Sequence, residues 1–221
     1  MPPQRKTSTR QYAIGAGVMA RDGIAGTLER IVVDPDDAQV VDLIVSVPRV
    51  GPDREVVVPA TRVVHADADG IVVDLTTAEV RALPEFEAVR FRQPEAGWEG
   101  LPEHTPDVVL FWAPRRAVEA FVPPSVVPEP NVEGVRNIPP DAITLAAEME
   151  VTCGHEVVGQ LDRILLDPEG DHATHLVVRR GVLGTEERIV PVTQVDRVTE
   201  ERVELRCDHQ ELDQMPRYRS N

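Results

Sequence analysis

The sequence predicts an all-β protein made of two small β-barrels in tandem, each with a short C-terminal helix, joined by a segment rich in proline and aromatic residues. Three observations favour this fold class. The chain is 42% apolar but only 4% aromatic, with valine prominent, which suits pleated and half-buried strands. Short apolar runs alternate with turn residues such as Asp34-Pro35, where proline presets φ and the aspartate can accept a backbone N–H. The chain also repeats itself.

The repeat aligns Gly26 with Gly159. The stretch "GTLERIVVDPDDAQVVDLIV" (26–45) matches "GQLDRILLDPEGDHATHLVV" (159–178) without a gap, and after one deletion "REVVVPATRV" matches "ERIVPVTQV". Both copies close on a strand, a short helix, a proline and an aromatic, as in "DLTTAEVRALPEF" and "ELRCDHQELDQMPRY". We infer a duplicated domain of about 70 residues, a size that can just hold a core of its own.

The individual elements follow from apolar runs and the turns between them. A helix is expected to begin after Thr76, where Glu79 can complete a capping box. Several short strands with close turns favour a barrel, because closure removes exposed strand edges. Strands are expected in copy one near 16–21, 26–33, 39–47, 54–59, 61–65 and 71–75, and in copy two near 149–153, 158–166, 173–180, 187–191, 194–198 and 202–206.

The predicted organisation has four parts: a flexible tail (1–11), copy one (12–86), a connecting segment (87–147) and copy two (148–221). The connecting segment holds five of the eight aromatic residues, whereas disordered linkers are poor in aromatics. Either the segment packs over the barrels, or part of it is a docking strip for a partner, since aromatics and arginine dominate interface energetics. The candidate docking residues are Phe111, Trp112, Arg115, Arg116 and Phe121.

Charge excludes several classes of partner. The net charge is −15, and only the segment 1–11 carries a net positive charge. The sequence therefore does not favour nucleic acid or an anionic membrane as a partner. No apolar run approaches the roughly 20 residues that span a bilayer, and the N-terminus has no apolar region typical of a signal peptide. Two cysteines are too few for a disulfide framework. We expect an acidic, soluble cytoplasmic protein of bacterial type.

The ordered motifs "DGIAGTLERIVVDPDDAQVVDLIVSV", "REVVVPATRV" and "GIVVDLTTAEVRALPEF" resemble the PRC-barrel family, named for the cytoplasmic domain of the photosynthetic reaction centre H subunit. Copy two resembles the family less well at its end, where "LRCDHQELDQMPRY" replaces the usual acidic-aromatic close. The resemblance covers about two thirds of the chain and implies an adaptor module without catalytic residues of its own. It also implies a second possibility, a factor associated with ribosome or RNA maturation.

One cluster in copy two could hold a metal. The candidate ligands are Cys153, His155, Cys207 and His209, because thiolate and imidazole are good zinc ligands. The spacing matches no CxxC or HExxH pattern, so packed thiols and separate surface histidines are the competing interpretation, and no metal or other cofactor is favoured. His172 and His175 flank a predicted turn and are expected in solvent.

The sequence contains no phosphate-binding, dinucleotide-binding or nucleophile-elbow motif, so we predict that the protein is not an enzyme. The sequence thus predicts an adaptor or scaffold that acts through protein–protein contacts of tandem barrels. The alternatives are a ribosome- or RNA-associated factor and a zinc-type metal-binding protein. The expected partner is another protein, and barrel surfaces could also support a homo-oligomer.

Overall fold

The computed structural model describes residues 10–49, 52–91, 132–147, 149–168, 170–180, 186–199 and 201–219. These residues divide into two units. One runs to Phe86 and resumes at Asn137; the other, Glu87–Arg136, contributes an antiparallel pair of strands, β8 (Glu87–Phe91) and β9 (Val132–Arg136). The predicted docking strip, Phe111 to Phe121, lies outside the described residues.

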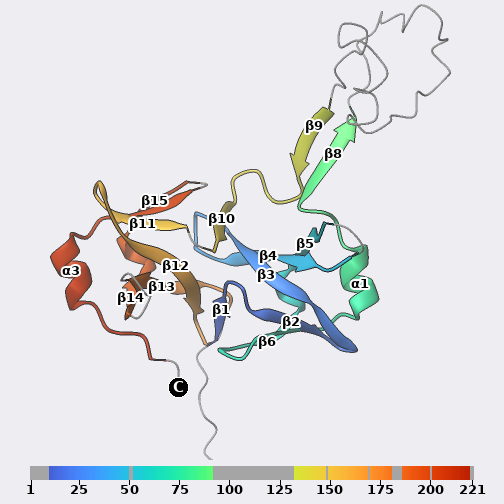
Figure 1. The fold of residues 1–221 in the computed structure, drawn as a ribbon, viewed down its shortest axis with the longest axis horizontal. Coiled ribbons are helices and arrows are strands. Elements are labelled where there is room, and N and C mark those ends of the chain that lie inside the picture. Colours follow the sequence, from blue (N-terminus) through green and yellow to red (C-terminus); the bar gives the residue numbers. More distant parts are fainter. Residues whose placement is uncertain are drawn as a thin grey trace, which may run out of the picture. The chain divides into compact units, whose positions relative to one another are not determined.

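Copy one forms a curled sheet with the strand order β5-β4-β3-β2-β7-β6 (Figure 1). Its core face is aliphatic: Val18, Leu28, Leu43 and Val58 are fully buried. The strand and helix bounds are β2 (Gly17–Ala20), β3 (Gly23–Val33), β4 (Val40–Val47), β5 (Arg54–Pro59), the 3-10 turn η1 (Ala60–Arg62), β6 (Val63–Ala66), β7 (Ile71–Val73) and α1 (Thr77–Ala82).

Copy two repeats this topology as β14-β13-β12-β11-β16-β15. The prediction of a mostly β protein with two curled sheets and short helices is confirmed, and the predicted strands agree with the observed ones to within a few residues. The bounds are β11 (Glu150–Cys153), β12 (Glu156–Leu166), β13 (Ala173–Arg180), β14 (Glu186–Pro191), η2 (Val192–Gln194), β15 (Val195–Val198), β16 (Arg202–Leu205) and α3 (His209–Gln214).

Each copy gives one strand to the sheet of the other copy. β1 (Gln11–Ala13) pairs antiparallel with β12, and β10 (Ile143–Ala146) pairs antiparallel with β3. The exchange is symmetric with respect to the repeat, because Tyr12 lies opposite Ile164 while its equivalent, Leu145, lies opposite Ile31. Neither strand is among those that the sequence predicts: β1 begins in the predicted tail, and β10 lies in the predicted connecting segment.

The two copies are related by a local two-fold symmetry at Gln39 and His172. These residues are equivalent in the repeat, and they form an isolated antiparallel bridge with each other. On either side, the Val40 N–H donates to the carbonyl of Asp171 and the Ala173 N–H donates to the carbonyl of Ala38, both at 2.8 Å. His172 was expected free in solvent; its ring is exposed, but its backbone belongs to this junction.

Further contacts tie the two copies into one unit. Gln11 is only 3% exposed, and its side-chain oxygen accepts a hydrogen bond of 2.7 Å from the Tyr218 hydroxyl. Arg10 forms an ion pair of 2.7 Å with Asp171. A single cluster of buried apolar side chains spans both sheets. The copies are therefore expected to unfold together, since neither sheet is complete without a strand from the other.

The two terminal helices begin with the same device. Thr76 and Glu79 form the predicted capping box, with the Thr76 hydroxyl accepting from the Glu79 N–H and the Glu79 carboxylate accepting from the Thr76 N–H. In copy two, Asp208 and Glu211 form the same arrangement. Each box satisfies N–H groups that have no partner within the helix.

Gly26 and Gly159, which begin the repeat, lie where strands approach closely. A Cβ on Gly26 would come 2.1 Å from the carbonyl oxygen of Ser46, and one on Gly159 would come 2.5 Å from that of Arg179. Backbone at these distances leaves no room for a side chain. The alignment of these two glycines therefore has a steric cause.

Candidate interaction surface and thiol pair

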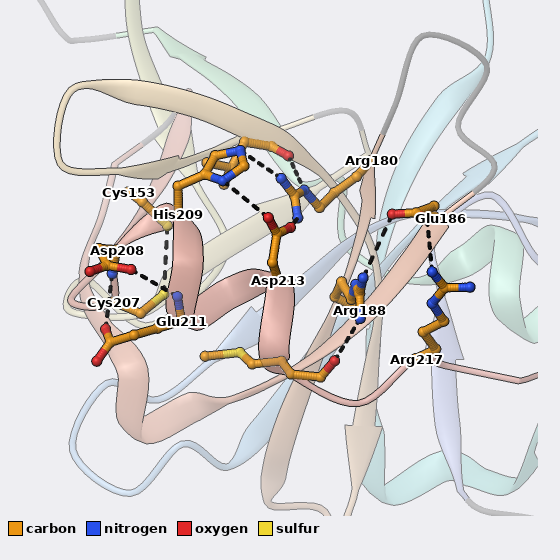
Figure 2. Close-up of polar contacts among 12 residues, drawn as sticks. Cys153, Arg180, Glu186, Arg188, Cys207, Asp208, His209, Glu211, Asp213 and Arg217 are labelled. Atoms are coloured by element: carbon orange, nitrogen blue, oxygen red, sulfur yellow. Dashed lines mark hydrogen bonds and ion pairs between the residues drawn. The ribbon is translucent and has the colours of Figure 1, made fainter.

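The cysteines predicted as metal candidates do converge. Cys153 ends β11 and Cys207 follows β16, the parallel neighbour of β11. Their Sγ atoms lie 3.5 Å apart, and both residues are buried and not disulfide-bonded (Figure 2). Burial, followed by the adjacent Cys207 sulfur, raises the pKa of Cys153 to about 12. At neutral pH the Cys153 thiol is therefore protonated in the metal-free protein, and a metal ion would have to displace its proton on binding.

The histidines do not join the thiols. His155 is exposed in the turn between β11 and β12. His209 on α3 has Nε2 2.8 Å from an Arg180 guanidinium nitrogen and Nδ1 3.4 Å from the Asp213 carboxylate (Figure 2). Arginine only donates, so Nε2 of His209 accepts and is occupied. Among the described residues, no group of three or more His, Cys, Asp or Glu is placed to hold a metal ion.

In the alignment of the two copies, Cys153 is equivalent to Ala20 and Cys207 is equivalent to Leu75. Both copy-one residues are buried, at 7% and 5% exposure. The thiol pair thus occupies the position of an apolar pair in the other core. Packing is sufficient to account for its location, because a buried thiol behaves as a small apolar group.

A different feature of copy one lies on the outer face of its sheet. Four large apolar side chains are exposed there: Ile24 at 73%, Val64 at 67%, Met19 at 41% and Val72 at 37%. The register places Met19 directly beside Ile24 on β3 and beside Val72 on β7. Val64 sits at the bulge of β6, between the pairs that His65 and Val63 make with β7. We call these four residues the apolar row; it crosses four neighbouring strands, β3-β2-β7-β6.

The row is a surface feature and does not belong to the core. The residues on either side of Met19 and of Val72 in sequence are buried and point to the opposite face, as strand alternation requires. No side chain projects beside the row at Gly17 on β2 or at Gly70, which immediately precedes β7. Beyond its other side lies Arg21, which pairs with Asp74 at 3.5 Å and with Glu79 at 3.1 Å.

Copy two shows what the same face looks like without an apolar row. The equivalents of Met19, Val64 and Val72 are Thr152, Asp196 and Glu204. Thr152 is only 2% exposed, so the surface at these positions consists of the apolar Val157 and two carboxylates. In copy two, Glu150 and Arg202 stand at the positions of these two glycines, and they lie opposite each other on β11 and β16. Two copies with the same backbone thus present one apolar and one charged outer face.

A cleft of about 490 Å³ lies between the exchanged strand β10 and the edge strand β15. Its walls are mainly aliphatic, with Ile143 and Leu145 on one side and Val195 and Val198 on the other. The cleft follows from the strand exchange, because β10 pairs into the sheet of copy one whereas β15 belongs to the sheet of copy two. Its lining also includes the charged residues Asp34, Asp196, Arg197 and Arg206, of which Asp196 and Arg206 form an ion pair of 3.1 Å.

Sequence reasoning did not single out the apolar row. The signal was nevertheless present: on β2 and β7, apolar residues stand at consecutive positions, "VMA" and "IVV", where one buried face requires only alternate ones. Comparing the two copies position by position would have revealed the row, because copy two has polar residues at three of the four positions. The inward faces alone define the core, and they are similar in both copies.

Comparison with known proteins identifies the first copy. Residues 14–80 match the PRC-barrel domain, a span that includes all four residues of the row. No curated protein matches the chain. Among the described residues, no helix has the length and apolar character needed to cross a bilayer. The chain therefore carries a PRC-barrel domain at residues 14–80, and the topology and register of that domain recur in copy two.

Proposed function

We propose that this protein is a non-enzymatic adaptor or scaffold that binds another protein through the outer face of its first PRC-barrel. The observation that carries the proposal is the apolar row, present on one copy and replaced by polar residues on the other. A PRC-barrel domain is typical of protein-interaction modules, which supports this class of function. Exposed apolar patches bordered by polar residues mark interaction sites.

The free energy gained by burying the four side chains of the row is large enough for a specific contact. Fully burying a Val, Ile or Met side chain contributes about 1.5–3 kcal/mol. Weighted by the exposure of the four side chains, covering the row would contribute on the order of 3–6 kcal/mol before the costs of association. Such a row supplies the centre of an interface, and the surrounding rim of a standard interface of about 800 Å² per partner would complete it.

The strand exchange supports a scaffold in particular. Because β1 and β10 lock the two sheets into one unit, a partner held on copy one keeps a fixed relation to anything held on copy two. The charged face of copy two and the strip Phe111 to Phe121 are candidates for a second contact; the strip stays a prediction. A rigid body with two binding faces holds its two partners at a fixed separation. A long flexible linker between the faces would lower the effective concentration of one partner at the other.

The test is co-purification of the tagged protein from its own organism after nuclease treatment, read by mass spectrometry. Three chains are compared: the wild type, the triple variant M19T/V64D/V72E, and the control V157T. The triple variant should keep its fold, because the three side chains that it replaces are exposed, at 41%, 67% and 37%. The control removes an exposed apolar side chain (54% exposed) from the other face.

A protein recovered with the wild type and with V157T but lost with the triple variant would support the proposal. Equal recovery with all three chains would contradict a role for the row. Ribosomal proteins that are lost on nuclease treatment would instead favour the RNA-associated alternative.

A further inference from the structure

We infer that the apolar row binds a partner segment whose centre is aliphatic or aromatic and whose margin is basic, and that it does not bind a second copy of this chain. The inference rests on the proposed function and adds the chemistry of the partner. It is carried by the charges around the row, described below, and by the contrast with copy two.

Carboxylates dominate the margin of the row. At the end of β7 and in the adjoining turns and helix, five acidic side chains border it, against two arginines, which gives a local net charge of −3 with His65 neutral. The acidic residues are Asp22, Asp67, Asp69, Asp74 and Glu79, and the basic ones are Arg21 and Arg62.

Two of these carboxylates are held in place and ionised by local hydrogen bonds. Asp22 accepts from the Thr77 backbone N–H at 2.7 Å and from the Thr77 hydroxyl at 3.0 Å, and the backbone contact is the main cause of its lowered pKa. Asp67 faces the His65 ring at 2.9 Å and accepts from the Asp69 N–H at 2.8 Å; the His65 contact is the main cause of its lowered pKa.

The arginines of the margin are already engaged within the protein. Arg21 is shared between Asp74 and Glu79. Arg62 donates to the backbone carbonyl of Asp74 at 3.0 Å. Arg21 offsets part of the charge of Asp74 and Glu79, and the margin as a whole keeps its net charge of −3.

Copy two again serves as the reference. The residues equivalent to Asp22, Asp67 and Asp74 are His155, Thr199 and Arg206, so these three carboxylates are absent from copy two. Asp69 and Glu79 correspond to Glu201 and Glu211, and the two arginines correspond to Gly154 and Gln194, so the equivalent positions carry a net charge of −1 in place of −3. The apolar row and the stronger negative charge of its margin thus occur together on copy one. Their coincidence is expected of a binding surface, where complementary charge guides a partner to an apolar centre.

Charge also decides against self-association through this face. A two-fold dimer would bring two margins of net charge −3 together, in a chain of net charge −15. Like charges juxtaposed at an interface cost several kcal/mol. A basic margin on a different protein meets the same carboxylates with attraction.

The test uses site-specific photocrosslinking in the source organism. p-Benzoylphenylalanine replaces Val64 in one full-length chain and its equivalent Asp196 in a matched control. The crosslinked peptide is sequenced by mass spectrometry. The expected result is an adduct from position 64, not from position 196, to a segment of another protein that combines apolar residues with a net positive charge.

The margin is tested in the same assay. We expect the double variant D22N/D69N to lower the yield of the position-64 adduct by about threefold to tenfold, and 0.5 M salt added to lysates before irradiation to do the same, because exposed charges act mainly on association and are screened. An adduct to an acidic or neutral segment, or to a second copy of this chain, would overturn the inference and leave the adaptor function standing. No adduct, or equal adducts from both positions, would overturn both.

Discussion

Tyr12 offers a direct test of the strand exchange. The residue belongs to copy one in sequence, but β1 lies on β12 of copy two, where Tyr12 pairs with Ile164 and is fully buried. Replacing it with alanine removes a large aromatic side chain from the shared core and should cost about 3–5 kcal/mol of the free energy of unfolding. Phenylalanine should change that free energy by no more than about 1 kcal/mol, because the ring is kept and the main loss is the contact of the Tyr12 hydroxyl with the Arg10 side chain.

The assay is urea denaturation of the full chain, combined with hydrogen exchange read by mass spectrometry. Tyr12→Ala should reduce protection from hydrogen exchange in β12 of copy two, because β1 pairs with β12 and not with β3 of its own copy. A loss below about 1 kcal/mol, or deprotection confined to β3 of copy one, would refute the exchange. A single unfolding transition is expected in either variant.

The pH dependence of Tyr12→Phe gives a second readout. Burial is the main reason why the pKa of Tyr12 rises from 10.0 to about 12. The unfolded chain therefore releases this proton first, so stability falls as the pH rises from about 10 to about 12 and is unaffected below that window. Tyr12→Phe should remove this part of the alkaline loss. An unchanged alkaline profile would contradict the assigned burial of the hydroxyl.

Three further outcomes are expected. The double variant C153A/C207L, which installs the residues of copy one, should stay within about 1.5 kcal/mol of the wild type in urea denaturation; both thiols of the wild type should react with Ellman's reagent only after unfolding, and rapid reaction in the folded state would contradict their burial. Gly26→Ala should cost about 1–3 kcal/mol or more, whereas Gly17→Ala, where a Cβ meets nothing within 4 Å, should be nearly neutral; equal losses would contradict the steric account. Asp208→Ala should cost about 1 kcal/mol by removing the cap of α3, measured by thermal unfolding, and no change would mean that the cap contributes nothing.

The strands of each copy could be predicted because apolar alternation and turn chemistry are local. The exchange could not, and the repeat itself is the reason. Tyr12 could pair with Ile31 of its own copy or with the equivalent Ile164, and the two environments are almost identical in sequence. Whether a strand pairs within its copy or across depends on the path of the chain between elements, which is a non-local property. The brevity of β1, three residues, also leaves no periodic signal.

The candidate site could be predicted only in part, because some of its contacts depend on elements that are distant in sequence. The approach of Cys153 to Cys207 follows from the parallel pairing of β11 with β16, and the sequence already groups the two cysteines as candidate ligands. The separation of His209 could not be foreseen, because Arg180 and Asp213 hold its ring from a strand and a helix that meet only in the fold. The apolar row depends on which side of a sheet is covered, and β2 and β7 carry apolar residues on both sides.

The most direct test of the central claim is hydrogen exchange of the full chain with and without the protein recovered in co-purification. The account predicts added protection in residues 17–24 and 63–73, which carry the apolar row, and none in the equivalent segments 150–157 and 195–205 of copy two. Protection confined to the copy-two segments, or absent from both, would contradict the claim that the outer face of the first barrel is the binding surface.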